Sequence, residues 1–285
     1  MGTLPSPEAL RVSLSTAPPA LQSATDSPAV RAAHPSPMVL RYFDDVFRET
    51  PATKRRDIEA AFRLRYQVYC LDRGYESAAD CPGDMEQDCY DDSALHCLLQ
   101  DRAKATPIGT VRLVRPTVTP TWFSDLPLAE YAPQESIEDI IRLPAGATAE
   151  VSRFAITRSA REILQGTDKP ISRDCDPLAG QGTLGEKLLP YMSLGLIRGL
   201  VRLSVEHGIT HWCLAAEPSL LRRLRHFGLH FCTTGPLFDH RGLRQICYAN
   251  LSELLERARV ERPEFWDIIT VGGFLVSAEL AQTAA

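Results

Sequence analysis

The sequence lacks an excess of positive charge. Its 31 lysine and arginine residues face 36 aspartate and glutamate residues, which gives a formal net charge of −5 over 285 residues. General binding to nucleic acid needs a basic surface that neutralises phosphates, so we do not expect it. The chain also has no apolar run near the roughly 20 residues of a membrane helix, and no signal pattern at its start. We therefore expect a cytoplasmic protein.

Two kinds of reactive motif are also missing. None of the eight cysteines forms a C-x-x-C pair, and without a secretion signal we interpret them as free thiols. No nucleophile elbow G-x-S-x-G occurs, and no motif places a histidine beside a cysteine, so a covalent route is not expected. The conceivable zinc ligands have spacings that match no compact zinc knuckle: Cys81, Cys89, His96 and Cys97. We expect no metal.

Hydrophobic residues, in contrast, make up 44% of the chain, which is enough for a sizeable core. Residues 1–38 are rich in proline, serine, alanine and threonine, and we predict a flexible leader. Residues 39–250 are predicted to form one domain, and residues 251–285 a C-terminal helical extension. The aromatic residues of this extension fit a packed helix, a lid or a peripheral contact with a membrane: Phe265, Trp266 and Phe274.

Apolar periodicity predicts a mixed order of helices and strands. Helical spacing covers residues 55–70, 184–207 and 218–227. Apolar or alternating runs predict strands at residues 95–99, 108–115, 150–157, 210–216, 229–233 and 245–250. Five prolines between 116 and 145 exclude long elements there, apart from a short helix near 127–131, and residues 158–182 form a polar insertion. This order is typical of an α/β (α+β) fold.

Three arginines fall at positions where burial is expected. Arg65 lies in the apolar stripe of the first helix, and Arg112 and Arg153 lie mid-strand between apolar neighbours. A buried guanidinium is costly unless a carboxylate meets it. The candidate partners are Glu86, Asp88, Asp91 and Glu150. For each arginine alone a structural ion pair is the simplest explanation, whereas the set of three indicates a site.

Strand alternation refines this prediction. In residues 150–154, Glu150, Ser152 and Phe154 share one face, and Val151 and Arg153 share the other. A carboxylate near arginines is expected to stay ionised, and through a water it could take the proton of an incoming ammonium. We expect Glu150 to be a weak base that acts through correct placement.

At this point four short motifs indicate a family. They are, in order, Arg65-x-x-Val68-Tyr69, Glu86-x-Asp88-x-Tyr90-Asp91, Gly109-Thr110-Val111-Arg112-Leu113 and Glu150-x-Ser152-Arg153-Phe154. In order and spacing they resemble the acyl-homoserine-lactone synthases. They resemble still more closely the related N-acyl amino acid synthases and the PEP-CTERM/exosortase-associated acyltransferases. The resemblance covers roughly residues 40–250.

The resemblance implies the GNAT fold, a twisted mixed sheet flanked by helices. The pantetheine arm of an acyl carrier protein thioester would lie in a V-shaped cleft between strands 150–157 and 210–216. Glu150 and Ser152 would be catalytic. The acceptor would be bound by Arg65, Tyr69, Glu86, Asp88, Asp91, Arg112 and Arg153. The donor would be bound by Phe154, Ala155, Gly180, Gly182 and Cys213.

Two departures from the family pattern narrow the substrates. The segment Pro177 to Gly182 keeps both glycines of the GNAT phosphate loop but opens with proline. This favours a carrier-protein arm, whose single phosphate fits a helix N-terminus, over coenzyme A. The lactone synthases place a tryptophan soon after the arginine helix, where this chain has Gly74 and Tyr75. An amino acid is therefore favoured as acceptor over S-adenosylmethionine.

Two further groups of residues have both a structural and a functional interpretation. A basic cluster could dock an acidic carrier protein by electrostatic steering, or could be a solvated helix face: Arg222, Arg223 and Arg225. Aliphatic residues of the long helix could line an acyl channel, or could pack in the core: Leu189, Leu194, Leu196, Ile197 and Leu200.

We therefore predict an N-acyltransferase that needs no cofactor and takes an acyl thioester as substrate. The acyl group would pass from 4'-phosphopantetheine of acyl carrier protein, or from acyl-coenzyme A, to the amine of an amino acid or a similar small molecule. A lactone signal synthase that uses S-adenosylmethionine is the first alternative. A catalytically silent acyl-binding regulatory protein is the second, and the intact Glu150 argues against it.

Overall fold

The computed structural model describes residues 38–164 and 184–276. The predicted leader, apart from its last residue, lies outside the described residues. The same holds for most of the polar insertion, and therefore for Gly180 and Gly182, which were predicted to bind the donor.

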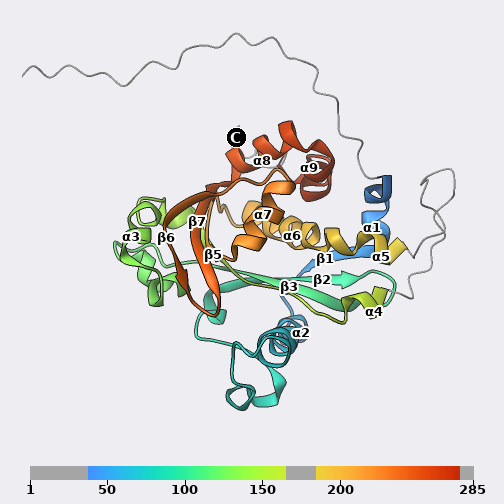
Figure 1. Ribbon diagram of the computed structural model, residues 1–285, viewed down its shortest axis with the longest axis horizontal. Coiled ribbons are helices and arrows are strands. Elements are labelled where there is room, and N and C mark those ends of the chain that lie inside the picture. Colours follow the sequence, from blue (N-terminus) through green and yellow to red (C-terminus); the bar gives the residue numbers. More distant parts are fainter. Residues whose placement is uncertain (1–37, 165–183, 277–285) are drawn as a thin grey trace, which may run out of the picture. The chain divides into compact units, whose positions relative to one another are not determined.

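A mixed sheet of seven strands forms the centre of the domain (Figure 1). The strand order is β1-β2-β3-β4-β5-β7-β6. All neighbours are antiparallel except β4 and β5, which are parallel. The strands are β1 Phe47–Pro51, β2 Ala94–Asp101, β3 Thr106–Val114, β4 Thr148–Ile156, β5 His211–Ala216, β6 Cys232–Asp239 and β7 Leu243–Asn250. The predicted mixed α/β class is confirmed.

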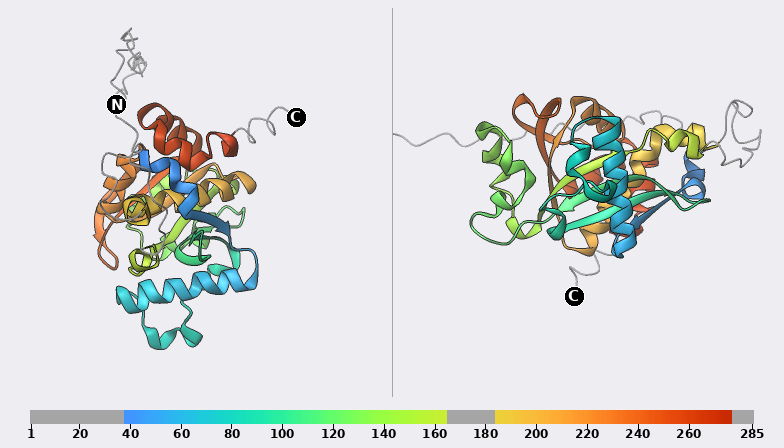
Figure 2. Two further views of the ribbon diagram at one scale, coloured as in Figure 1. Left: turned by 90° about the vertical axis from the view of Figure 1, so that its right-hand side faces the viewer. Right: turned by 90° about the horizontal axis from the view of Figure 1, so that it is seen from below.

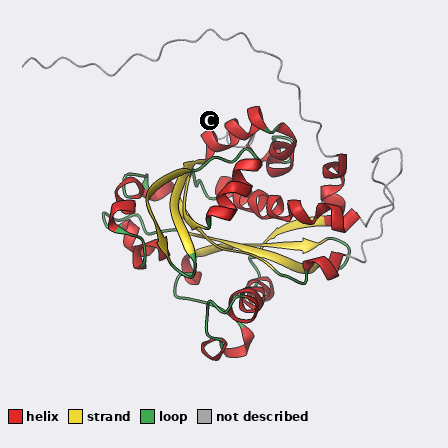
Figure 3. Ribbon diagram, viewed as in Figure 1, coloured by secondary structure: helices red, strands yellow, loops and turns green. Residues whose placement is uncertain are grey.

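Helices cover both faces of this sheet (Figure 3). On one face α2 (Arg55–Arg65) packs against β2, β3 and β4, and the left view of Figure 2 shows this helix, in cyan, apart from the others. On the other face α6 (Met192–Glu206) lies across β1, β2 and β3. The remaining helices are α1 Phe43–Val46, α3 Gln134–Ile140, α4 Ala160–Leu164, α5 Leu184–Leu188, α7 Pro218–His226, α8 Leu251–Glu261 and α9 Pro263–Thr270.

The core lies between α6 and the sheet. Gly195 and Gly199 let α6 approach β2 closely, because a Cβ added at either would stand 2.4 Å from a Leu99 methyl or 2.3 Å from the Cys97 sulfur. Residues 184–206 are, against the sequence expectation, long and apolar enough to cross a membrane by length and composition. In the most apolar 18-residue stretch of this segment, 72% is buried inside the domain, so packing in the core accounts for its apolar character.

The structure settles several predicted boundaries. The sequence pattern of the helix predicted at 184–207 is interrupted by Pro190 and Gly195, and the structure confirms the first interruption as a 3₁₀ turn, Leu189–Tyr191, because Pro190 cannot donate the hydrogen bond that helix continuation needs, whereas α6 continues through Gly195. The strand predicted at 229–233 begins only at Cys232, since Leu229 packs into the core directly after the turn at Gly228. The edge strand β1 was not predicted at all.

The C-terminal extension is a packed pair of helices in its described part. Helix α8 follows β7 without a break, and the Asn250 side chain caps it by accepting a hydrogen bond from the backbone N–H of Glu253. In α9, Phe265 and Ile269 are fully buried, and the helix packs on α6. The packed-helix interpretation is therefore confirmed for residues 263–270, while Phe274 beyond them is exposed.

Candidate active site

The sheet opens between β4 and β5. The two strands pair only at Thr148–His211, Ala149–Trp212 and Glu150–Cys213, and beyond Glu150 they separate. The predicted V-shaped cleft is therefore confirmed. From residue 151 to residue 156, the edge of β4 that faces β5 has no ladder partner in the described chain, so its backbone polar groups face the opening.

A β-bulge lies in β4 just after the point of separation. Thr110 pairs with Ala155 and Arg112 with Ser152, so Val111 alone stands opposite two residues, Arg153 and Phe154. Arg153 has a positive φ of 51°, a conformation that is unusual for a residue with a side chain. A bulge bends its strand and increases the local twist, which turns β4 away from β5.

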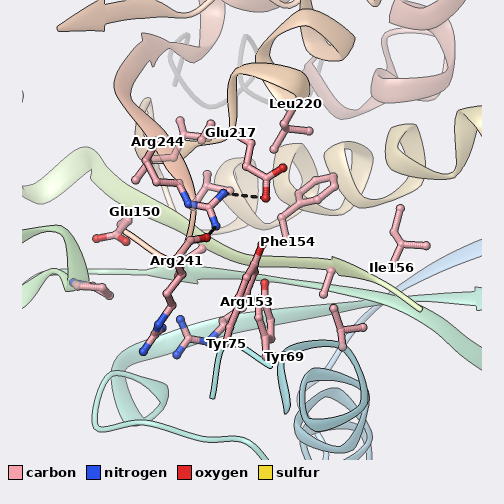
Figure 4. Close-up of a pocket in the computed structure, with 18 of the residues that line it drawn as sticks. Tyr69, Tyr75, Glu150, Arg153, Phe154, Ile156, Glu217, Leu220, Arg241 and Arg244 are labelled. Atoms are coloured by element: carbon pink, nitrogen blue, oxygen red, sulfur yellow. Dashed lines mark hydrogen bonds and ion pairs between the residues drawn. The ribbon is translucent and has the colours of Figure 1, made fainter. Parts of the chain in front are cut away.

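A pocket of about 650 Å³ fills the opening and has two different walls. One wall is largely apolar and comes from β4, α6 and α7; Figure 4 shows Phe154, Ile156 and Leu220 on this side. The other wall is polar and comes from the loop that follows the helical segment Tyr66–Asp72, from the bulge of β4 and from the β6–β7 hairpin. Its residues include Tyr75, Glu76, Arg153, Arg241 and Arg244. Glu150 also lines the pocket.

Behind the polar wall, Arg65 anchors a buried charge cluster. Its side chain is fully buried, Nε donates to Glu86 Oε2 at 2.5 Å, and Nη1 and Nη2 donate to the two oxygens of Asp91 at 2.7 and 3.1 Å. The predicted burial of Arg65 and its pair with Asp91 are confirmed. The helical stripe that placed Arg65 against the sheet also explains why it needs two carboxylates.

Arg112 joins this cluster to β4. Its Nη1 donates to Asp88 Oδ1 at 2.6 Å and to Asp91 Oδ1 at 2.7 Å, and its Nε donates to Ser152 Oγ at 3.0 Å. Since the Ser152 oxygen accepts from Arg112, the proton of the same hydroxyl is free to point elsewhere, and Ser152 lines the pocket. Arg112 thereby fixes the position of the serine.

Arg153 lies on the same side of the sheet as Ser152, and not on the opposite side as strand alternation predicted. Its Nη2 donates to Glu86 Oε1 and to Asp88 Oδ2, both at 2.9 Å. Its guanidinium also lies 5.5 Å from the ring centre of Tyr69. The bulge is the reason for the error, because the extra residue breaks the two-residue period of side chains along β4.

The cluster holds its carboxyl groups as fixed anions. Burial by itself raises the pKa of Asp91, but the hydrogen bonds and charges of Arg65 and Arg112 outweigh burial and hold that pKa well below its usual range. The same balance, with Arg65 and Arg153 as partners, lowers the pKa of Glu86. These groups bind and position, and they do not exchange protons near neutral pH.

Glu150 differs from these carboxyls, and the expectation that it stays ionised was wrong. Its exposed fraction is 1%, and its Oε2 accepts one hydrogen bond, from the backbone N–H of Leu128 at 2.8 Å. Burial raises the pKa of Glu150 to about 8, because this N–H and the more distant Arg112 and Arg153 offset only part of the desolvation. Glu150 is therefore mostly protonated at pH 7 and, once ionised, is a stronger base than an ordinary carboxylate.

Some of the other predicted site residues line the pocket and some do not. Of those predicted to bind the acceptor, Tyr69, Glu86, Asp88 and Arg153 line the pocket. Three others do not line it, because their partners enclose them behind the wall: Arg65, Asp91 and Arg112. Phe154 and Ala155, predicted to bind the donor, line the pocket. Cys213 does not, since its side chain is fully buried and packs in a separate apolar cluster.

Sequence reasoning missed much of the polar wall. Arg244 Nη1 pairs with Glu217 at 2.9 Å (Figure 4), and Arg241 pairs with Glu76. These residues come from a hairpin tip, a helix N-terminus and a loop, where no period links one residue to the next. Only the Arg241-Gly242 dipeptide, a turn signal, pointed to a hairpin there.

Helix α7 carries the three arginines predicted to dock a carrier protein. All three are exposed. Arg223 also lines the pocket, whereas Arg222 and Arg225 do not. Within residues 38–164 and 184–276 no carboxylate forms an ion pair with them, which leaves a positive surface beside the opening between β4 and β5.

The residues considered for zinc are not arranged as a site. Cys97 is fully buried and Cys89 is exposed, and neighbouring positions of β2 send His96 and Cys97 to opposite faces. Within residues 38–164 and 184–276, no group of three or more histidine, cysteine or acidic side chains could hold a metal ion. The seven cysteines in these ranges are free thiols.

Comparisons with known proteins agree with this geometry at the level of the fold. Residues 64–164 match the family described as the acetyltransferase (GNAT) domain, and this stretch runs from the last turn of α2 through the charge cluster, β2, β3 and β4. The chain thus has a GNAT-like fold. No curated protein matches it significantly.

Solved structures that resemble this chain include three synthases. The acyl-homoserine lactone synthase LasI is 17% identical, with a TM-score of 0.49 over 71% of this chain and 88% of that one. The CoA-dependent acyl-homoserine lactone synthase BjaI, with SAM and isopentyl-CoA, is 18% identical, with a TM-score of 0.48 over 75% and 89%. FeeM, an N-acyl amino acid synthase from uncultured soil microbes, is 15% identical, with a TM-score of 0.46 over 74% and 95%. No conclusion about substrate rests on these likenesses.

Proposed function

We propose that the protein is an N-acyltransferase that moves a fatty acyl group from an acyl carrier protein thioester to the amine of an amino acid or similar small molecule. The observation that carries this proposal is Glu150. It is a buried carboxyl with a pKa of about 8, and it lies where two strands part to open a pocket with one apolar and one polar wall.

The apolar side suits the donor. A pantetheine arm that enters between β4 and β5 would meet the unpaired edge of β4, and backbone N–H groups of residues 151–156 would stabilise the oxygen of the thioester carbonyl as it becomes negative. The acyl chain would lie against Met192, Ile197 and Leu200 of α6, which line the pocket. The other candidates for an acyl channel on α6, Leu194 and Leu196, are fully buried core residues.

The polar side suits the acceptor. The amine must lose a proton before its lone pair can attack the thioester carbon, and ionised Glu150 would take that proton directly or through a water. The new C–N bond forms as the C–S bond breaks, the nitrogen releases its second proton to water, and the proton held by Glu150 passes to the departing thiolate. A base with a pKa near 8 is well matched to this task, whereas an ordinary carboxylate would be too weak.

The positive surface of α7 supports a carrier protein as the source of the thioester, because carrier proteins are acidic and steering acts over several ångströms. The resemblance to the PEP-CTERM/exosortase-associated acyltransferases and to the N-acyl amino acid synthases belongs to the same proposal. It gives the acceptor as an amino acid.

The test is incubation of the protein with acyl carrier protein thioesters and, separately, with acyl-coenzyme A of the same chain length. Each donor is combined with pools of amino acids, S-adenosylmethionine or polyamines, and products are identified by mass spectrometry. An N-acyl amino acid made from the carrier-protein donor is the expected product. An acyl-homoserine lactone would establish the signal-synthase alternative. Thioester binding without any acylated product would establish the catalytically silent one.

A further inference from the structure

An ion pair joins two segments of the polar wall at the entrance of the pocket. Arg241, at the tip of the β6–β7 hairpin, meets Glu76, in the loop after α2, with both ends of its fork: Nη1 to Oε1 at 2.5 Å and Nη2 to Oε2 at 2.9 Å. Both residues line the pocket, and they come from positions 165 residues apart in the chain. Figure 4 shows Arg241 reaching down from the hairpin towards Arg153 and Tyr75.

The backbone holds Arg241 in an unfavourable conformation. Its φ is +54°, and Gly242 beside it has a φ of +95°. Glycine and asparagine occupy left-handed turn positions of this kind at little cost, whereas arginine does so at a cost in stability. The turn itself therefore does not explain the arginine, and the position of its guanidinium at the pocket does.

The pair is exchangeable. The side chains of Arg241 and Glu76 are 38% and 22% exposed, and ion pairs that open to water contribute little net stability. Glu76 has a second cation nearby, because its Oε1 lies 3.8 Å from Nη2 of Arg153. A carboxylate from outside can thus replace Glu76 on Arg241 without leaving Glu76 isolated.

The local charge also calls for an anion. Around the mouth, Arg241 and Arg244 are each matched by one glutamate, whereas Arg73 donates a hydrogen bond to the hydroxyl of Tyr75. Arg73 lines the same pocket and forms no ion pair within residues 38–164 and 184–276, and the carboxylate whose pKa its charge lowers, Glu217, is already paired with Arg244. One further carboxylate would balance this edge.

We infer that Glu76 stands in for the carboxylate of the acceptor, and that Arg241 is the residue that binds that carboxylate. The inference rests on the proposed function for the identity of the acceptor. The acceptor is then a zwitterion: its carboxylate pairs with the guanidinium of Arg241, the displaced Glu76 keeps Arg153 as its partner, and the ionised Glu150 takes the proton of its ammonium end. Amines without a carboxylate, such as polyamines, lack the group that opens the pair.

Binding in the absence of donor tests this inference without any need for turnover. Each of the twenty protein amino acids is titrated calorimetrically into the purified protein. The derivative in which the α-carboxylate is replaced by an amide is titrated separately. For the tightest acid, Arg241→Gln should weaken binding about 10- to 100-fold, the usual effect of losing hydrogen bonds between charged groups. The amide should bind weakly to wild type and variant alike. Arg241→Lys should fall between them, because an ammonium cannot form the two-pronged pair.

Glu76→Gln gives the opposite sign. It removes the internal competitor, so the acid should bind up to about fivefold more tightly, in line with the small net value of an exposed ion pair. Arg257→Gln is the matched control, since Arg257 forms an exposed pair with Glu261 at 2.8 Å far along the chain on α8. It should change neither affinity, and melting curves of all variants establish that each is folded.

The outcomes separate this inference from the proposed function. The inference is overturned if no amino acid binds, if Arg241→Gln weakens acid and amide equally, or if it changes only the KM for the acyl donor. If the binding pattern holds and no acylated product forms with any donor, the carboxylate site stands and the acyltransferase proposal fails. If the Arg241→Gln protein transfers an acyl group to acid and amide alike, the acyltransferase proposal stands and the carboxylate site fails.

Discussion

Asp91 and Glu150 are carboxyl groups whose side chains have little exposed surface, and their pKa values move in opposite directions. Asp91 meets two guanidinium groups, which hold its pKa well below the usual range. Glu150 meets one backbone N–H, and burial raises its pKa to about 8. The depth of burial therefore does not decide the charge of a carboxyl; the number of charged partners does.

This difference separates two tasks within one site. Glu86 and Asp91, which pair with arginines, have pKa values below the usual range and help to fix the shape and charge of the site. Glu150 lines the pocket and has its pKa raised into the neutral range, so it is the group suited to move a proton. Replacing Glu150 should therefore change turnover, whereas replacing an arginine partner of Glu86 and Asp91 should change the stability of the protein.

The largest expected effect is on turnover. Glu150→Gln keeps the shape and the hydrogen bond from Leu128 but removes the base, so kcat should fall on the order of 10²–10⁴-fold. In the wild type, kcat/KM should rise with pH up to about 8, because the ionised form of Glu150 is the active one. Rates at saturating donor across pH 6–9 provide the measurement.

A folded Glu150→Gln protein with near-normal turnover at pH 7 would contradict this assignment. The amine would then arrive already deprotonated, and Glu150 would have only a structural role. A rising limb that persists in the variant would assign the ionisation to the substrate.

Removing an arginine from the buried charge cluster should lower the stability of the protein and not primarily its turnover. Arg65→Ala leaves Glu86 and Asp91 buried without their main partner, and breaking a buried ion pair in this way costs about 3–5 kcal/mol of unfolding free energy. Urea denaturation measures it. The exposed pair of Arg257 offers a comparison, since Arg257→Ala should cost no more than about 1 kcal/mol. Equal effects of the two substitutions would mean that the cluster is not enclosed as described.

The pH dependence of stability should identify Glu150 directly. Its folded-state pKa of about 8 lies above the ordinary value of 4.5. The carboxyl therefore costs nothing below pH 4.5, and as the pH rises towards 8 the unfolded chain gains a charge that the folded protein lacks. Relative to wild type, Glu150→Gln should gain on the order of 4 kcal/mol of unfolding free energy over this interval. A difference that stays constant with pH would place the pKa of Glu150 near its ordinary value.

The smallest expected effect concerns the exposed arginines of α7. Replacing Arg222, Arg223 and Arg225 with glutamate should raise the KM for acyl carrier protein about tenfold at low salt, and less at high salt, because the contribution is long-range steering. The kcat should change little. Equal rates with acyl-coenzyme A, unaffected by the substitutions, would remove the carrier protein from the proposal.

The sequence predicted the arginine–carboxylate cluster better than it predicted the protonation of Glu150. Arg65 and Arg112 lie in regular elements, so helical and strand periods correctly buried them and required carboxylates nearby. The protonation of Glu150 could not be predicted, because sequence proximity to arginines does not show which carboxyl they contact. Asp88 and Asp91 take those contacts, and Glu150 is left with Leu128, which a proline-rich loop brings from 22 residues away.

The fold shows the same limit. Strands with apolar runs were found close to their observed positions, whereas β1, with the mostly polar sequence Phe47–Pro51, carries no strand signal of its own and forms by pairing with the apolar β2. The hairpin tip with Arg241 and the loop with Glu76 meet only in three dimensions. Nothing local in either segment predicts the other.

The bulge at Arg153 has a consequence for protein engineering. Because one extra residue in β4 brings Ser152 and Arg153 to the same side, the site cannot be transplanted into another sheet by copying side chains onto a regular strand. In such a graft the arginine would point into the opposite, apolar layer, and Glu86 and Asp88 would lose a partner. A designer must copy the insertion itself and provide the neighbouring carboxylates that hold the chain in its left-handed turn.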